Sequence, residues 1–216
     1  SHHRAMLTSL TRGYAGKNQN GSAKGGGSLN KIQRDFMDMV YDSGRGSRHR
    51  NFDRIKATLE SMAADVRPVV VNLQEVSQEL RPYNVHALGR WDGYTPLHVA
   101  THYGYEDVCK IFLSCRADPN IVESERGFAP LHAAVSRNLP TTEVLVQILL
   151  QEKADPNLPT KDGNSPLHVA IIEIQEFYKS AKTGAKMNFN EEAVIEKLLH
   201  AGADPFQTNE AGSTPF

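Results

Sequence analysis

Apolar side chains recur at steps of three and four residues in the N-terminal part of the chain. One stripe comprises Leu29, Ile32, Phe36, Met39 and Val40, and a second comprises Phe52, Ile55, Leu59 and Met62. This spacing places each set on one face of a helix, so it predicts two amphipathic helices. A third stripe of Val69, Leu73, Val76 and Leu80 follows Arg67-Pro68 and predicts a third helix, although Val69-Val70-Val71 is equally typical of the start of a strand.

Glycine-rich segments precede and interrupt these stripes. Residues 43–50 (SGRGSRHR) predict a basic loop broken by glycine, between the first two helices. Residues 1–6 resemble the remnant of an expression tag, and residues 21–28 (GSAKGGGS) have the composition of a flexible linker. We therefore expect residues 1–28 to be flexible or disordered and to contribute no core.

A motif returns at intervals after Tyr83. It is GYTPLHVA at residues 93–100, GFAPLHAA at 127–134 and GNSPLHVA at 163–170, and a fourth copy begins at 212–216. A pair of large apolar residues and an Ala-Asp-Pro turn follow each of the first three copies. Thr or Ser before proline is a favourable helix start, and the Asp-Pro turn ends a second helix. Each copy therefore predicts a short helical pair that buries its apolar face only by stacking on its neighbours.

This motif resembles the ankyrin repeat over about residues 84–216. The resemblance implies an all-α solenoid of helix-turn-helix units, with three repeats in residues 83–208 and the start of a truncated further repeat in 209–216. Residues 29–82 would form an N-terminal helical cap. Residues 51–82 are open to a second interpretation as a degenerate repeat, because Tyr83-Asn84-Val85-His86 stands where an Asp-x-Asn turn would be.

The third copy is longer than the others. From its proline to its turn aspartate there are 22 residues in the first copy, 25 in the second and 38 in the third. The extra residues fall in 171–192, where we expect the first helix to continue through Tyr178 before residues 179–190 return to the second. Lengthening a loop costs only about 0.6 kcal/mol per doubling. The insertion is therefore open to two interpretations, a second partner contact and a neutral elaboration.

Composition and charge exclude several classes of protein. No window approaches eighteen consecutive apolar residues and no secretory signal is evident, so we expect an intracellular, cytoplasmic protein without membrane contact, with the nucleus left open. Two cysteines are too few for a disulfide framework. The formal net charge of -1 conceals a basic head: residues 1–54 hold ten Lys/Arg against four Asp/Glu.

Candidate catalytic and metal-binding groups are weak. His98, His132 and His168 recur at equivalent positions, which stacked repeats would hold about 8–10 Å apart, too far to share an ion. The ankyrin resemblance implies instead that these histidines hydrogen-bond the backbone of the turns. Cys109 occupies an apolar helix position, and no nucleophile lies in a pattern with a base. We expect no enzyme activity, no metal and no cofactor.

The resemblance also implies a binding surface. In this family, positions around the hairpin glycine and at the end of the first helix face a concave groove that contacts partners. Carried over residue by residue, the predicted partner-binding residues are Trp91, Asp92, Tyr94, His102, Tyr103, Arg126, Phe128, Arg137, Asn164 and Ile172. The same positions include Glu125, Ser136, Lys161, Asp162 and Glu173. For Trp91, packing against the N-terminal helices is the alternative.

Three functional hypotheses follow. The leading one is a scaffold or adaptor that binds a partner protein or peptide in the concave groove. The second is a targeting or substrate-recruiting domain of a larger enzyme, channel or pathogen effector, since the sequence stops inside a repeat. The third is nucleic-acid contact through the basic residues Arg45, Arg48, His49, Arg50 and Arg54. A solvated loop is favoured over this third hypothesis, because no recognition motif accompanies the arginines.

Overall fold

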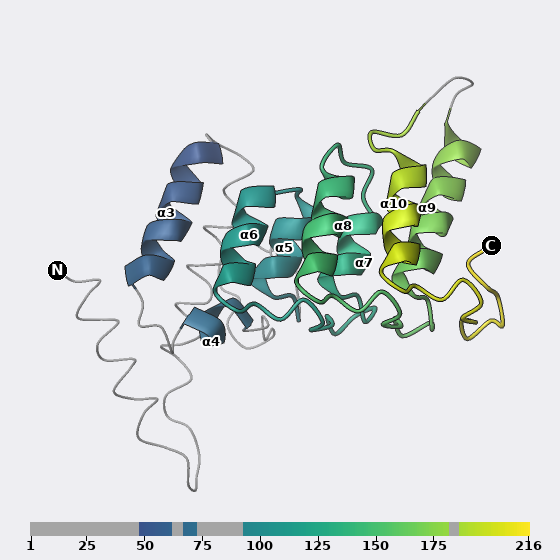
Figure 1. Ribbon diagram of the computed structural model, residues 1–216, viewed down its shortest axis with the longest axis horizontal. Coiled ribbons are helices and arrows are strands. Elements are labelled where there is room, and N and C mark those ends of the chain that lie inside the picture. The colour runs from purple at the N-terminus through teal and green to yellow at the C-terminus, as the bar shows by residue number, and fades with distance from the viewer. Residues whose placement is uncertain (1–47, 62–66, 73–92, 182–185) are drawn as a thin grey trace, which may run out of the picture.

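The computed structural model describes residues 48–61, 67–72, 93–181 and 186–216, and its regular elements there are all α-helices. They are α3 (Arg48–Ser61), α4 (Arg67–Asn72), α5 (Pro96–His102), α6 (Glu106–Ser114), α7 (Pro130–Val135), α8 (Thr142–Gln151), α9 (Pro166–Ser180) and α10 (Glu191–His200), and they follow one another along a single stack (Figure 1). The predicted all-α class is confirmed.

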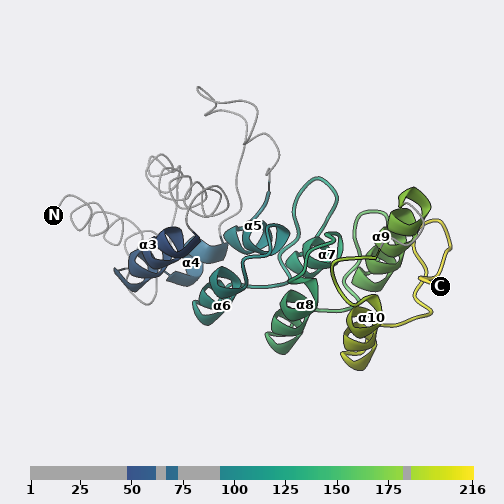
Figure 2. The same ribbon diagram turned by 90° about the horizontal axis from the view of Figure 1, so that it is seen from above.

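The helices from α5 onward form two rows. Figure 2 shows α5, α7 and α9 in one row and α6, α8 and α10 in the other. Within the first row α5 packs on α7 and α7 on α9, and within the second α6 packs on α8 and α8 on α10. Leu97, Leu131 and Leu167, one from each helix of the first row, are at most 1% exposed. The stacking of helical pairs that the repeated motif predicts is thus confirmed.

The motif specifies how each first-row helix begins. Proline is the first helical residue of α5, α7 and α9. It has no backbone N–H, so it leaves no donor unpaired in the first turn of the helix. The side chains of Thr95 and Ser165 cap α5 and α9, whereas Ala129 before α7 offers no such cap. In all three helices the residue before proline also donates its backbone N–H to the histidine Nδ1 three positions later, at 3.1–3.2 Å.

A ladder of asparagines joins the turns along the edge of the stack. The side-chain oxygens of Asn72, Asn120 and Asn157 accept hydrogen bonds from the backbone N–H of the next turn aspartate at 2.6–2.7 Å. Their amide groups donate to a carbonyl of that same turn at 2.8–3.0 Å. Phe206 stands at the next position of the ladder and is 81% exposed. The asparagine contacts therefore link α4 to the first repeat as they link the repeats to one another.

The structure changes several expectations for the N-terminal part. The prediction of a basic loop over 43–50 is wrong for residues 48–50, because α3 begins at Arg48. Arginine is a good helix former. Val71, which the third stripe omits, is fully buried in α4. Residues 83–86, considered above as a degenerate turn, lie outside the described residues, so that interpretation stays a prediction. The flexible segment 1–28 and the first predicted helix also lie outside them.

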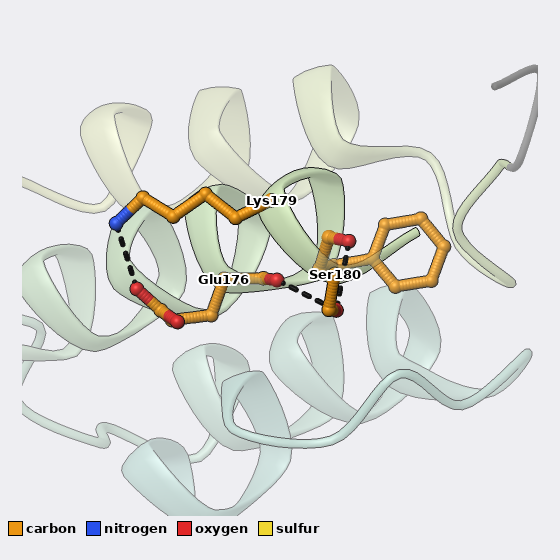
Figure 3. A network of polar contacts seen from close by, with 4 residues as sticks. Glu176, Lys179 and Ser180 are labelled. Carbon is orange, nitrogen blue, oxygen red and sulfur yellow. Dashed lines mark hydrogen bonds and ion pairs between the residues drawn. The ribbon is translucent and has the colours of Figure 1, made fainter. Parts of the chain in front are cut away.

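The inserted segment lengthens α9 to fifteen residues, against seven in α5 and six in α7. Figure 3 shows the far end of α9, where Lys179 Nζ lies 2.7 Å from Glu176 Oε1 and the Ser180 hydroxyl donates to the Glu176 carbonyl at 2.8 Å. The Tyr178 hydroxyl donates to the carboxylate of Glu191 at the start of α10. These contacts stabilise the last turns of α9 and join them to the start of α10.

The return segment also contacts the preceding repeat. The Asn188 backbone N–H donates to the side-chain oxygen of Asn138 at 2.6 Å, and the Asn188 amide donates to the Asn138 carbonyl at 3.0 Å. Phe189 beside it is 8% exposed and belongs to the core cluster. The described part of the insertion is therefore packed against the stack.

Candidate functional site

Among the described residues, three hairpin tips are closed by a backbone hydrogen bond, at residues 123–128, 160–164 and 209–213, and the first two, which flank α7, differ in length. In the long tip, residues 123–128, the backbone N–H of Glu123 donates to the carbonyl of Phe128 at 2.8 Å. In the short tip, residues 160–164, the same bond runs from Thr160 to Asn164 at 2.9 Å. The long tip thus contains one residue more than the short tip between its bonded ends.

A buried carboxylate organises the long tip. Glu123 is only 1% exposed, and its side chain accepts hydrogen bonds from the backbone N–H groups of Glu125 at 2.6 Å, Arg126 at 2.7 Å and Phe128 at 3.0 Å. Hydrogen bonds to a charged acceptor are stronger than those between neutral groups. Three of them on one side chain hold the backbone of the tip in a single conformation.

The long tip presents Arg126 in a fixed position. Its guanidinium lies 4.1 Å from the centroid of the Phe128 ring and donates from Nη2 to the Tyr94 hydroxyl at 3.2 Å. Burial raises the pKa of Tyr94 above its ordinary value, which is already well above neutral pH. Partial burial lowers the pKa of Arg126. The hydrogen bond to Tyr94 and the nearby carboxylates raise it by a larger amount, so the net change is upward. The result is a charged guanidinium that lies against the Phe128 ring and is hydrogen-bonded to the Tyr94 hydroxyl.

A pocket of about 470 Å³ opens at this guanidinium. The first repeat, the long tip, the end of α7 and the second turn of α9 all contribute to its wall. The lining residues are Tyr94, His102, Glu125, Arg126, Phe128, Ala133, Ser136, Arg137 and Glu173. The pocket therefore spans three successive helices of the first row, which is the row that carries the hairpin tips.

The charges in the pocket are balanced but not paired. It holds two arginines and two glutamates. Burial raises the pKa of Glu173, and the attraction of Arg137 and Arg126 opposes that rise. Among the described residues, no hydrogen bond or ion pair joins the side chain of Arg137 or of Glu173 to another group. The pocket thus offers a donor and an acceptor whose hydrogen-bonding capacity is unused within the described fold.

Comparison with known proteins identifies the repeats. Residues 97–209 match the family model described as ankyrin repeats (3 copies). The chain belongs to the ankyrin repeat family. It is 30% identical over 132 residues to the zebrafish neurogenic locus notch homolog protein 1 and 34% identical over 118 residues to the mouse ankyrin repeat and MYND domain-containing protein 1. It is 28% identical over 137 residues to the putative ankyrin repeat protein L371 of a mimivirus.

These matches concern only part of each protein. They cover 61%, 52% and 63% of this chain, in the same order, but only 5%, 12% and 17% of the relatives. The likeness therefore extends to the repeats and not to the remainder of those larger proteins. In the part of the chain that the structure describes, no helix has both the length and the apolarity to cross a membrane.

Half of the ten predicted partner-binding residues line the pocket of this ankyrin stack. They are Tyr94, His102, Arg126, Phe128 and Arg137. The structure also places Glu125, Ser136 and Glu173, from the same predicted positions, in the lining. Hence the positions around the hairpin glycine and at the end of the first helix converge on one pocket.

Three of the other predicted residues, Tyr103, Asn164 and Ile172, do not line it. Tyr103 stacks on Tyr105, with ring centroids 5.6 Å apart, and Asn164 accepts a hydrogen bond from the Asn209 amide at 2.8 Å. Ile172 is 43% exposed on α9. Trp91 and Asp92 lie outside the described residues, so their assignment to the groove stays a prediction.

Sequence reasoning missed Glu123 and the extra residue of the long tip. The signal was the distance from the turn aspartate to the hairpin glycine, which is nine residues from Asp118 to Gly127 but eight from Asp155 to Gly163. The spacing from proline to the turn aspartate lies within each helical pair, so it does not include the tips.

The recurring histidines use both ring nitrogens inside the fold. Their Nε2 atoms donate to the carbonyls of Phe128 at 2.9 Å, Asn164 at 3.3 Å and Ser213 at 3.0 Å, while Nδ1 accepts from the backbone. Burial lowers the pKa of His98 and of His132 to about 4, so both rings are neutral at pH 7. The hydrogen bonds to the turn backbone that the ankyrin resemblance implied are thus present, and each histidine supports the next hairpin tip.

Proposed function

We propose that this chain is a protein-interaction module that binds an extended segment of a partner protein across the pocket beside the long tip. Ankyrin repeats are in general protein-protein interaction modules, so the family supports the class of function. The observation that carries the proposal for this chain is the convergence of Tyr94, Arg126, Phe128 and Arg137 on one pocket. Tyrosine and arginine are enriched among the residues that dominate binding energy at interfaces.

The shape of the pocket supports an extended segment over a single small ligand. Its lining reaches from His102 on α5 to Glu173 on α9, so it crosses the stack rather than descending between two helices. Its polar groups are long side chains on the surface, which is typical of a surface that binds another protein. We place the partner along the first row, with its central residue at Arg126.

The test uses peptides selected from a random display library on the full 216-residue chain. Calorimetry then compares the wild type with Ser136→Arg, which fills the pocket with a large side chain. We expect Ser136→Arg to weaken binding by about tenfold or more, because a central interface position is blocked.

Val144→Arg is the matched control. Val144 is 40% exposed on α8, in the second row, and does not line the pocket. The Val144→Arg variant introduces the same side chain as Ser136→Arg. It should change binding by less than about twofold, since exposed positions outside an interface contribute little. Equal binding by the wild type and Ser136→Arg would contradict the proposed site.

The insertion at residues 171–192 is the proposed second contact. Ile172 and Tyr178 support it, because they are 43% and 51% exposed on α9. Replacing both by serine should weaken binding of a long partner segment while leaving that of a short pocket-bound peptide unchanged. If neither changes, the insertion is a neutral elaboration.

The other hypotheses stay proposals. A targeting domain within a larger protein is supported by the small share, 5–17%, that the match covers of the three relatives named above. Of the basic residues considered for nucleic acid, Arg54 is exposed on α3, whereas nothing is described for the side chains of the other four. Elution of the chain from heparin without retention at low salt would end that proposal.

A further inference from the structure

The pocket has a chemical preference that follows from its arginines, and this inference rests on the proposed function. We infer that the pocket recognises a single carboxylate side chain of the partner segment, which Arg126 and Arg137 bind from two sides. The partner segment would therefore carry an aspartate or glutamate at the residue that enters the pocket.

The first support is the preorganisation of Arg126. Glu123 fixes its backbone, the Phe128 ring lies under its guanidinium and the Tyr94 hydroxyl accepts from Nη2. A guanidinium has five N–H donors in a planar fork that matches a carboxylate. Its contacts within the described fold occupy one face and one nitrogen, so the remaining edge is available for a partner. Little side-chain entropy would be lost on binding, because the group is already held in place.

The second support is the unused capacity of Arg137. This exposed residue lines the same pocket and makes no side-chain hydrogen bond or ion pair among the described residues. Two guanidinium groups that face one space and are not neutralised by contact with a carboxylate favour an anionic occupant. Glu173 attracts both arginines but forms no ion pair with either, so their hydrogen-bond donors stay available to a bound carboxylate.

The two lining glutamates decide which anion fits. With Glu125 and Glu173 opposing Arg126 and Arg137, the lining has no formal excess of positive charge. A phosphate group carries nearly two negative charges at pH 7, which increases its repulsion from both glutamates and its attraction to both arginines alike. The net charge of the lining therefore gives a dianion no advantage over a carboxylate, and the directed hydrogen bonds of the guanidinium groups set the preference.

The experiment measures capture of four peptide pools by the full chain. Each pool contains eleven-residue peptides with a fixed central residue, which is glutamate, glutamine, phosphoserine or lysine, and random residues elsewhere. We expect the glutamate pool to be captured about tenfold more than the glutamine pool, which corresponds to one well-formed charged contact. The phosphoserine and lysine pools should be captured less than the glutamate pool.

Variants assign the preference to Arg126. Arg126→Gln should bring the glutamate-to-glutamine ratio close to one, and Arg126→Lys should leave an intermediate ratio, because lysine retains the charge but not the planar fork. Arg54→Gln, an exposed arginine on α3, is the matched control and should leave the ratio unchanged. Urea unfolding of each variant checks that the fold is retained.

The remaining outcomes separate this inference from the proposed function. Equal capture of the glutamate and glutamine pools, with both reduced by Ser136→Arg, would overturn the carboxylate preference and leave the binding pocket standing. Stronger capture of the phosphoserine pool would overturn it in favour of a phosphate site. No capture of any pool would contradict the proposed function itself.

Discussion

The long tip and the short tip are the same structural unit built with different chemistry. Both close with a backbone hydrogen bond, and both contain a glycine at positive φ, +76° at Gly127 and +75° at Gly163. The short tip is organised by the Thr160 hydroxyl, which accepts from the Asn164 backbone at 3.1 Å. The long tip uses the buried Glu123 carboxylate, which accepts three such bonds. One added residue and one carboxylate thus convert a connection between repeats into a rigid support for Arg126.

The largest expected effect acts on both tips together. His98 supports the long tip and His132 the short tip, and burial lowers the pKa of each to about 4. Because this lies below the unfolded value of about 6.5, the unfolded chain binds more protons at intermediate pH. The stabilisation is present above pH 6.5 and is lost as the pH falls towards 4. At pH 5 each histidine should remove about 2 kcal/mol of the unfolding free energy.

Urea unfolding at pH 7 and pH 5 measures this loss. Titration of the histidine ring signals by NMR in the folded chain checks its origin. A stability that is the same at both pH values, or rings that titrate near pH 6.5, would contradict the account.

The next effect separates the tips. Glu123→Ala removes the acceptor of three backbone hydrogen bonds and should lower the unfolding free energy by about 3 kcal/mol. Thr160→Ala removes one neutral acceptor and should cost about 1 kcal/mol. Chemical denaturation of the two variants gives the comparison directly. Equal losses would mean that the carboxylate does not organise the long tip.

Alanine at the tip glycines Gly127 and Gly163 should lower the unfolding free energy less than Glu123→Ala does. A Cβ on Gly127 would lie 2.9 Å from the Lys161 backbone nitrogen, and one on Gly163 would lie 2.8 Å from that of Glu210. Backbone strain and this close contact together should cost about 2 kcal/mol for alanine at either position. Gly212→Ala is the matched control, because its φ is also +76° and nothing lies within 4 Å. It should cost about 1 kcal/mol, and equal thermal stabilities of the three variants would show that the contact is unimportant.

Arg126→Gln should have the smallest effect on stability, although it should have a large effect on binding. Arg126→Gln removes a contact with an aromatic ring and one hydrogen bond at an exposed side chain, so it should cost less than about 1 kcal/mol. Its thermal unfolding should therefore resemble that of the wild type. A loss of several kcal/mol would mean that Arg126 serves the fold, and its role in recognition would have to be reconsidered.

The comparison also explains what the sequence predicted and what it did not. The starts of α5, α7 and α9 were predicted, because the signal is local: proline is the first helical residue of each, and Thr95 and Ser165 cap two of them. Tyr94, Arg126 and Phe128 were predicted from their positions beside the hairpin glycine. The role of Glu123 depends on a tip conformation that one extra residue creates, and its burial has no signature in the local pattern.

The N-terminal end shows the same limit. Asn72 joins α4 to the first repeat through the bond that Asn120 and Asn157 make further along. The sequence around Asn72 lacks the Asp-Pro turn that precedes the other two asparagines. Only the packing of α4 against α5 brings this asparagine to the turn of the next repeat.

The central claim is that the long tip, and not the stack alone, creates the recognition site. Replacing residues 123–127 (ESERG) by the TKDG of the short tip tests it, with capture of the glutamate and glutamine pools as the measurement. We predict a folded chain whose glutamate-to-glutamine ratio falls from about ten to about one, because Arg126 and its support are removed. A folded chain that keeps the wild-type ratio would contradict the claim.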